Sequence, residues 1–343
     1  MHLDPEDQRF KKFLQILLMV KAKSSDIESR NILQIVLASL IFGQIIQNLE
    51  ERVASFTYCL LGGAGALEVA DFLNNVDFKL INLMDPLTGR MLLMAAIFSC
   101  VGPILTVAAT NSFKDAFVVP MGEEKTVQEL KRKMSTGTLS DHLMFVNVYN
   151  AWEDAGKRHK ENQFAWKNFL SNTVLTQLKG HRQQFLGFLY EKKFVESLDP
   201  ESPELNVNSK NLALVRAVIT AGLYPNVCCV KTLGRKRRAR LLVSPNERCL
   251  ALHPKGVNET VPMHHFDNLW LLYREKVKSN KVFIYDSSIV PNYPLLFFGQ
   301  NLDYDERTAC IDVDGFVKMQ CKSKDVANLI QNLCLRVLEF INY

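Results

Sequence analysis

The chain has 343 residues, 48% of them hydrophobic and 22% charged, which is enough apolar sequence to bury a substantial core in two or three domains. That composition excludes a disordered chain. The formal net charge of +5 comes from 41 basic and 36 acidic side chains, so any preference for an anionic partner must arise from local clusters.

The cysteines and the start of the chain indicate a protein of the cytoplasm or nucleus. The eight cysteines form no C-x-x-C pair and lie mostly within apolar runs, as expected in a reducing compartment. Cys228 and Cys229 would face opposite sides of a strand, and His264-His265 has no partner at ligand spacing, so we expect no metal site. The opening MHLDPEDQRFKKF does not resemble a secretory signal.

The first strongly apolar segment, Met91 to Thr110, imitates a membrane span. It is uncharged, and its length is close to the roughly 20 residues that cross a bilayer. However, Gly102-Pro103 interrupts it, and its flanks show neither an aromatic belt nor a charge bias. We therefore expect two short buried helices separated at Gly102-Pro103 and no membrane partner, with a membrane span as the alternative.

The middle of the chain has helical periodicity with polar stretches on either side. Apolar residues recur at helical spacing from Leu139 to Ala155, after an N-cap at Ser140, and again from Phe164 to Glu191. Each of these stretches is predicted to be a helix. The polar residues 123–140 and 199–210 are predicted to be linkers.

Beyond Pro225 the pattern changes to short β-branched and aromatic runs separated by turn signals, and five or six strands at this spacing predict a small barrel. The runs are VCCVKTL, RARLLV, CLALHP, WLLYREKV, KVFIYDSS and PLLFFG. A closing amphipathic helix is predicted from Asp325 to Tyr343. Its apolar face would consist of Leu329, Leu333, Val337 and Phe340.

The sequence contains no recognisable catalytic signature. A G-x-x-x-x-G-K-[ST] loop, a DEAH-like acidic tetrad, an H-E-x-x-H motif and a G-x-S-x-G motif are all missing from it. Without a phosphate-binding loop and an acidic pair for Mg²⁺, this chain is not expected to hydrolyse ATP, and no cofactor is assigned to it.

Six blocks keep their order and spacing along the chain: DPLTGRMLLMAAIFSCVGPILTVAATNSFKDAFVVP, SDHLMFVNVYNAWEDA, FAWKNFLS, VITAGLYPNV, HPKGVN and KVFIYDSSIVPNYPLLFFG. Together they resemble the region that follows the motor domains of DEAH/RHA-type RNA helicases, most of all the branch that resolves G-quadruplexes. The resemblance implies a winged helix, a ratchet-like helical bundle and an oligonucleotide-binding (OB) fold.

The resemblance also implies a division of the chain. It predicts an α+β multidomain protein whose first two thirds are mostly helical. In the winged-helix segment, Asn74-Asn75 stands where the family has Thr-Pro, so that domain is expected to be degenerate. The expected parts are an unassigned segment (1–29), the winged-helix segment (30–85), the ratchet-like domain (86–222), the OB-fold (223–300), and an extension with the closing helix (301–343).

The densest positive cluster lies in KTLGRKRRAR, on both sides of a turn at Gly234. An OB-fold presents basic side chains to phosphates along a groove, and such contacts are strong, salt-dependent and blind to sequence. The alternatives are a solvated hairpin and a nuclear import signal. The candidate nucleic-acid-binding residues in this cluster are Lys231, Arg235, Lys236, Arg237, Arg238 and Arg240.

A second set of candidates lies in REKVKSNKVF. Lys276 and Lys278 alternate along a predicted strand and would share a face beside Ser279, where the resemblance implies that an incoming RNA strand passes. An edge strand protected by lysines is the alternative. Lys255, in HPKGVN, is a further candidate.

The helical part supplies the remaining candidates. The resemblance implies a ratchet helix, on which Asn168 and Arg182 are candidate nucleic-acid contacts. Ser140-Asp141-His142 is expected to cap a core helix, with a loop near RNA as the alternative. Trp152 and Trp166 fall on apolar faces and are expected in the core, with base stacking as the alternative.

Two functions are consistent with these features. In the first, the chain is the RNA-gripping auxiliary region of an ATP-dependent helicase. It would hold single-stranded RNA or DNA, including strands from G-quadruplexes, while motor domains missing from this sequence bind ATP and Mg²⁺. In the second, it is a stand-alone nucleic-acid-binding or adaptor protein without enzymatic activity. Motor motifs in the upstream genomic sequence would decide between them.

We expect the purified chain to show no RNA-stimulated ATPase activity, because it has no loop to bind the phosphates. Phosphate release would be measured with and without RNA, against a mock purification. Turnover that stays with the protein through further purification would contradict this expectation.

Overall fold

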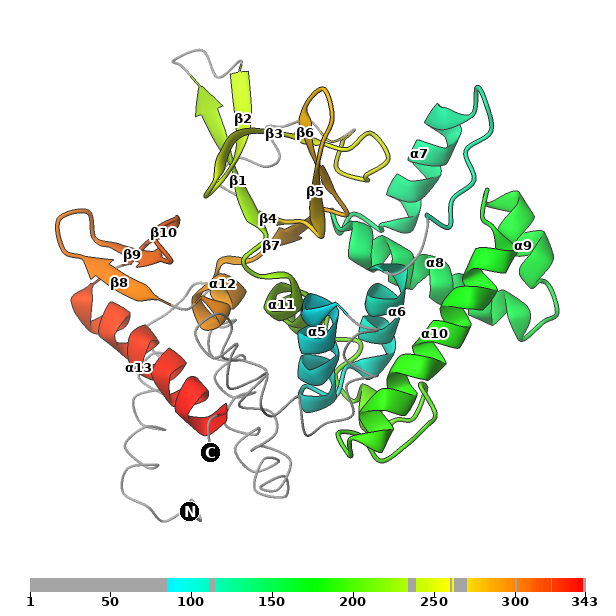
Figure 1. Ribbon diagram of the computed structural model, residues 1–343, viewed down its shortest axis with the longest axis horizontal. Coiled ribbons are helices and arrows are strands. Elements are labelled where there is room, and N and C mark those ends of the chain that lie inside the picture. Colours follow the sequence, from blue (N-terminus) through cyan, green and yellow to red (C-terminus); the bar gives the residue numbers. More distant parts are fainter. Residues whose placement is uncertain are drawn as a thin grey trace. The chain divides into compact units, whose positions relative to one another are not determined.

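The computed structural model describes residues 85–111, 115–233, 239–259, 261, 270–299, 301–321 and 323–341. The predicted segment 1–29 and, apart from its last residue, the predicted winged-helix segment 30–85 lie outside these residues. The chain divides into two compact units, one of residues 62–330 and one of residues 1–61 and 331–343. The packing described below belongs to the first of them (Figure 1).

The first part of the described chain is helical, as predicted. Side chains of Asp85, Ser140, Ser171 and Asn211 cap four of its helices, each accepting a hydrogen bond of 3.1 to 3.3 Å from a backbone N–H in the first turn. The helices are α5 (Pro86–Ile97), α6 (Val101–Asn111), α7 (Glu124–Met134), α8 (Asp141–Gly156), α9 (Glu161–Lys167), α10 (Asn172–Glu191) and α11 (Leu212–Leu223).

Helices α5 and α6 form the buried pair predicted from Met91 to Thr110, but the position predicted for the break is wrong. The chain turns at Phe98 to Cys100, where Ser99 has a φ of 47°. Gly102-Pro103 lies instead in the first turn of α6, where a proline removes no helical hydrogen bond. Within the described ranges, no helix is both long enough and apolar enough to cross a membrane.

The helix predicted from Phe164 to Glu191 is in fact two helices, α9 and α10. Between them, Phe169 has a φ of 54°, and Ser171 begins α10 by capping the N–H of Val174. The apolar periodicity continues across this break, so periodicity alone could not reveal it.

The two polar stretches predicted as linkers are packed structure. Residues 123–140 contain α7, which buries only Val127 and Lys131, too few side chains to give a visible apolar period. Residues 199–210 fold around Asn206. Its side chain binds the backbone of Gly102, Pro200 and Ser202 at 2.8 to 2.9 Å.

The barrel predicted after Pro225 is present. Its strands follow the order β5-β6-β3-β2-β1-β4-β7, in which β3 and β6 are parallel and the other pairs antiparallel. Only two residues separate β4 from β5, and two separate β6 from β7, so β4–β5 and β6–β7 are each one nearly continuous stretch. These two stretches pair with each other at both ends of the strand order, and the sheet therefore closes on itself (Figure 1). The strands are β1 (Val227–Leu233), β2 (Ala239–Ser244), β3 (Glu247–Leu252), β4 (Trp270–Leu272), β5 (Glu275–Lys278), β6 (Val282–Tyr285) and β7 (Ser288–Val290).

The interior of the barrel is filled by side chains that alternate along its strands. Leu139, which immediately precedes the cap of α8, packs against this cluster, so the helical part contributes to the barrel core. The buried cluster consists of Cys228, Leu250, Leu271, Tyr273 and Ile284.

The end of the chain differs in part from the prediction. PLLFFG is not a strand but lies in the helix α12 (Asn292–Phe298), which Pro291 precedes in an extended conformation. A three-stranded antiparallel sheet of β8 (Leu302–Asp305), β9 (Cys310–Val313) and β10 (Val317–Gln320) follows, and it was not predicted. The closing helix is α13 (Lys324–Ile341), and most side chains of its predicted apolar face lie outside those described.

Gly222 provides a test of the packing between α5 and α11. A Cβ built there would lie 2.5 Å from Cβ of Met91, so Gly222→Ala would force the two helices apart. We expect a loss of about 1–3 kcal/mol in the free energy of unfolding, as for other overpacked cores. Urea denaturation followed by circular dichroism would measure it.

Gly187→Ala is the matched control, because Gly187 lies within α10 and a Cβ added there would meet no neighbour within 4 Å. There the substitution should raise stability by up to about 1 kcal/mol through helix propensity. Equal effects at the two positions would contradict the packing argument.

Candidate nucleic-acid interface

The basic run KTLGRKRRAR begins in strand β1 and ends in strand β2, which form a hairpin. The two strands pair in register, with Lys231 opposite Leu241 and Thr232 opposite Arg240. Residues 234–238, with Arg235, Lys236, Arg237 and Arg238, lie outside the described residues, as do the side chains of Lys231 and Arg240. The hairpin is therefore established by its backbone, and the phosphate contacts of its side chains stay a prediction.

The second basic set lies at the β5–β6 hairpin. Strand β5 stands at one end of the strand order and is exposed along its length, and Lys276 and Lys278 fall on one face of it. Nζ of Lys276 lies 3.4 Å from Oε1 of Glu247, while Lys278 and Ser279 are exposed. Both the nucleic-acid role and the alternative of a lysine-protected edge strand fit this geometry.

The loop that follows β3 carries Lys255. The Lys255 side chain is exposed, whereas its carbonyl accepts a 3.1 Å hydrogen bond from Nζ of Lys131 on α7. Two residues earlier, the ring of His253 stacks on Tyr285 at 4.0 Å between centroids. Burial, followed by the charge of Lys255, lowers the pKa of His253.

A cavity of about 240 Å³ lies where this loop meets the helices. Its charged lining side chains largely pair with one another. Nζ of Lys131 lies 3.0 Å from Asp115, and Nε of Arg274 lies 3.3 Å from Asp286. The cavity is therefore electrostatically compensated and has no excess of positive charge to attract a phosphate.

Ser140, Asp141 and His142 join the helical part to the barrel. The Asp141 carboxylate accepts the N–H of Val257 at 2.7 Å and the N–H of Ser287 at 2.8 Å. Ser140 Oγ and His142 Nδ1 each lie 2.6 Å from Oγ of Ser288, and Ser140 also caps α8. We call these contacts the Asp141 junction. The capping role expected from the sequence is confirmed, but the contacts with the barrel were not foreseen.

Burial changes the protonation of the Asp141 junction. It raises the pKa of Asp141 to about 7, helped by the charge of Asp286, although the two backbone N–H donors and Lys131 oppose the shift. Burial also lowers the pKa of His142 to about 3, with a smaller effect from Arg274, so its imidazole is neutral at physiological pH. The pKa of Asp286 is raised by its own burial.

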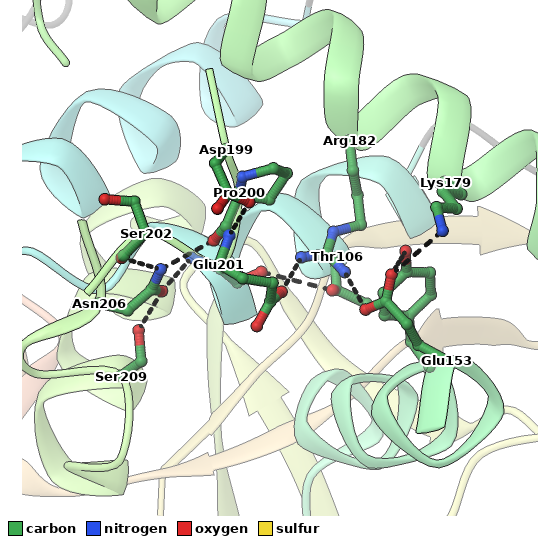
Figure 2. Close-up of polar contacts among 12 residues, drawn as sticks. Thr106, Glu153, Lys179, Arg182, Asp199, Pro200, Glu201, Ser202, Asn206 and Ser209 are labelled. Carbon is green, nitrogen blue, oxygen red and sulfur yellow. Dashed lines mark hydrogen bonds and ion pairs between the residues drawn. The ribbon is translucent and has the colours of Figure 1, made fainter. Parts of the chain in front are cut away.

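Arg182, a candidate from the ratchet helix, is buried. Its side chain is 3% exposed and its guanidinium lies 4.1 Å above the ring of Tyr149, between Glu153 at 3.9 Å and Glu201 at 3.4 Å. Figure 2 shows it pointing from α10 between α8 and the 199–209 loop. In this arrangement the guanidinium is paired within the protein, and the nucleic-acid contact expected of Arg182 stays a prediction.

The remaining helical candidates are Asn168, Trp152 on α8 and Trp166 on α9. Asn168 follows α9, is half-buried, and donates from Nδ2 to the carbonyl of Phe164 at 2.8 Å. Trp152 is buried as expected, with Nε1 donating to Asn172 at 2.7 Å. The expectation for Trp166 is wrong, because its side chain is 88% exposed. The position of Trp166 matched the apolar spacing of a helix. However, α9 has only 7 residues, too few for the spacing to determine which face of the helix is buried.

A five-stranded barrel made of β1, β2, β3, β4–β5 and β6–β7, closed by a parallel pair, defines the class of OB-fold proteins. Residues 215–302 match the family model described as oligonucleotide/oligosaccharide-binding (OB)-fold. Residues 85–145 match the helicase associated domain (HA2), ratchet-like.

Curated relatives agree with these matches. The human ATP-dependent DNA/RNA helicase DHX36 is 37% identical over 276 residues, which cover 78% of this chain and 27% of the relative. The Arabidopsis thaliana DExH-box ATP-dependent RNA helicase DExH1 is 36% identical over 284 residues, 82% of this chain and 28% of that protein. The chain is thus homologous to the C-terminal region of the DExH/DEAH-box RNA helicases, and it spans about a quarter of the length of these relatives.

The raised pKa of Asp141 predicts a pH dependence of stability. Because the folded state keeps this proton up to about pH 7 while an unfolded carboxyl loses it near pH 4, the contribution to stability is complete below about pH 4 and is lost as the pH rises to 7. Each pH unit in this window costs up to about 1.4 kcal/mol. In Asp141→Asn this part of the pH dependence of stability should vanish, because asparagine does not titrate.

Asp141→Asn should also lower stability by about 1–3 kcal/mol at pH 4. The NH₂ group of asparagine cannot accept a hydrogen bond, so one of the two backbone N–H donors would lose its acceptor. Thermal unfolding from pH 4 to 8 would measure both effects. Asp303→Asn, at an exposed carboxyl, is the control for the change in charge. A wild-type and an Asp141→Asn curve that stay parallel across the whole range would contradict the assignment.

Proposed function

We propose that this chain grips single-stranded RNA or DNA for a helicase, with the strand lying on the OB barrel between its two basic hairpins. In OB-folds, ligands lie across the second and third strands, between the loop that joins strands 1 and 2 and the loop that joins strands 4 and 5. In this barrel those loops are the β1–β2 and β5–β6 turns. The observation that carries the proposal is that both basic clusters of the sequence fall on them.

The ends of β1 and β6 that adjoin these turns lie at the same end of the barrel in Figure 1. A strand that reaches both would meet positive side chains on each side and a rigid sheet beneath. Such contacts read the backbone and not the bases. Homology supports this reading, because the relatives are named DNA/RNA and RNA helicases.

Energy conversion is assigned to other domains. ATP and Mg²⁺ would be bound by the motor domains of a longer polypeptide, acting in cis, while this chain would keep hold of the strand between steps. We extend the proposal to strands drawn from G-quadruplexes, on the sequence resemblance described above. The cytoplasm, the nucleus or both would be the site of action, in line with the cysteine usage.

The hairpins are tested by charge removal. We expect the fourfold variant Arg235→Gln, Lys236→Gln, Arg237→Gln, Arg238→Gln to bind unrelated single-stranded RNAs more weakly and about equally so. The slope of log affinity against log salt should fall by up to about 0.7 for each phosphate that the variant no longer neutralises. Lys276→Gln with Lys278→Gln should act in the same direction.

Fluorescence anisotropy at several salt concentrations measures both quantities. Lys192→Gln with Lys210→Gln removes two exposed charges from the helical part and should leave the slope unchanged. A nuclear import signal predicts altered localisation with wild-type affinity, so equal affinities and equal slopes for the fourfold variant would remove the β1–β2 hairpin from the interface. A quadruplex-forming RNA and a scrambled RNA of the same composition test the finer claim.

A further inference from the structure

Trp166 is a large aromatic side chain held almost entirely in solvent. Its exposed fraction is 88%, while Trp152, one helix earlier, is 6% exposed. Tryptophan is usually well buried, because its ring gains more than most side chains from leaving water. An indole exposed to this degree gains nothing for the fold, which suggests that it contacts a partner.

The backbone holds this indole on a fixed support. Ala165 is buried against the bundle, and its carbonyl accepts the N–H of Leu170 at 2.9 Å. Leu170 in turn pairs with Phe117 in an isolated β-bridge, and the N–H of Val118 donates to the carbonyl of Phe169 at 2.8 Å. Trp166 therefore projects from a tethered helix and would not need ordering before it binds.

Exposed apolar side chains and positive charge occur on the segments next to Trp166 in the chain and on the segment bonded to Phe169. Val118 and Met121, from the segment tied to Phe169, are exposed, and Met121 is fully so. The exposed basic residues of α9 and of the turn before it outnumber the acidic ones. They are Lys157, Arg158, Lys160 and Lys167, against Asp154, which pairs with Lys157 at 2.8 Å, and the partly exposed Glu161.

We propose that Trp166 is a stacking platform for a base of single-stranded nucleic acid, whose phosphates lie against Lys160 and Lys167. This deepens the proposed function and rests on it. A stacked base covers an exposed ring, and a phosphate backbone complements cations that outnumber the acidic side chains beside them. An apolar protein segment would satisfy the ring and leave the charges unmatched.

Asn162 and Gln163 lie one turn before Trp166 and are also exposed. Their amides are within the same helical face and offer donors and acceptors to the edge of a stacked base. Stacking itself accepts any base, so the platform would be tolerant of sequence, as the backbone contacts of the barrel are.

The test separates stacking from phosphate contacts. Trp166→Leu keeps an apolar side chain and loses the aromatic ring, while Trp166→Phe keeps a ring. With a labelled oligo(dT) of about 16 nucleotides, we expect Trp166→Leu to bind about 5- to 150-fold more weakly, the range measured for one base–aromatic stack. Trp166→Phe should recover most of that loss.

The salt dependence is the second readout. Because a stack releases no counterions, the slope of log affinity against log salt should be the same for Trp166→Leu and for wild type, unlike that of the hairpin variants. Met121→Ala, at another fully exposed apolar side chain, should leave affinity unchanged. Since Trp166 is exposed, thermal melts of all three variants should match wild type.

Each result decides between the two claims. If the wild-type chain binds oligo(dT) and Trp166→Leu binds it with equal affinity, the platform proposal is overturned and the barrel proposal stands. Trp166→Phe as weak as Trp166→Leu, or Met121→Ala equally impaired, indicates a general apolar docking surface and also overturns it. If the wild-type chain does not bind oligo(dT) or RNA, both proposals fail.

Discussion

The side-chain carboxyl group of Asp141 joins the helical part and the barrel within one compact unit. Its two oxygens accept backbone N–H groups from two different barrel loops, one after β3 and one before β7. Ser140 and His142, on either side, both reach the hydroxyl of Ser288. Lys255 lies in the first of these loops, two residues before Val257, so the hydrogen bond between Val257 and Asp141 fixes the position of Lys255 relative to α8.

Burying this carboxyl is costly, and the shift of its pKa to about 7 reflects that cost. An apolar contact would hold the two parts together without fixing either loop at a defined atom. Two acceptors on one rigid group instead set the backbone of both loops. Gly256 fits the same requirement, because a Cβ there would lie 3.2 Å from Oδ2 of Asp141.

The sequence was informative where one local rule decides a structure. Ser140 was predicted as a cap and is one, and the strand runs from Val227 to Gly299 were predicted as a barrel, which the structure confirms from Val227 to Val290. Elements that depend on distant partners were missed. Helix α7 presents little apolar surface because Lys131 fills its buried position by pairing with Asp115. The Asp141 junction joins three of the blocks that carried the resemblance, SDH, HPKGVN and DSS, whose mutual contact no local pattern encodes. Trp166 was misjudged and the burial of Arg182 was not foreseen, because the faces of α9 and α10 are set by packing and not by period.

Two sets of described cations have different physical roles. Lys131, Arg182 and Arg274 are paired with carboxylates inside the fold and add little field outside it. Lys278 of β5 and Lys167 of α9 are exposed, and at physiological salt their attraction extends only about 8 Å. A chain of net charge +5 therefore cannot draw a strand across its whole surface. Its grip has to come from separate short-range contacts, and because phosphate contacts weaken steeply with salt, an aromatic stack would be the contact best able to persist as salt rises.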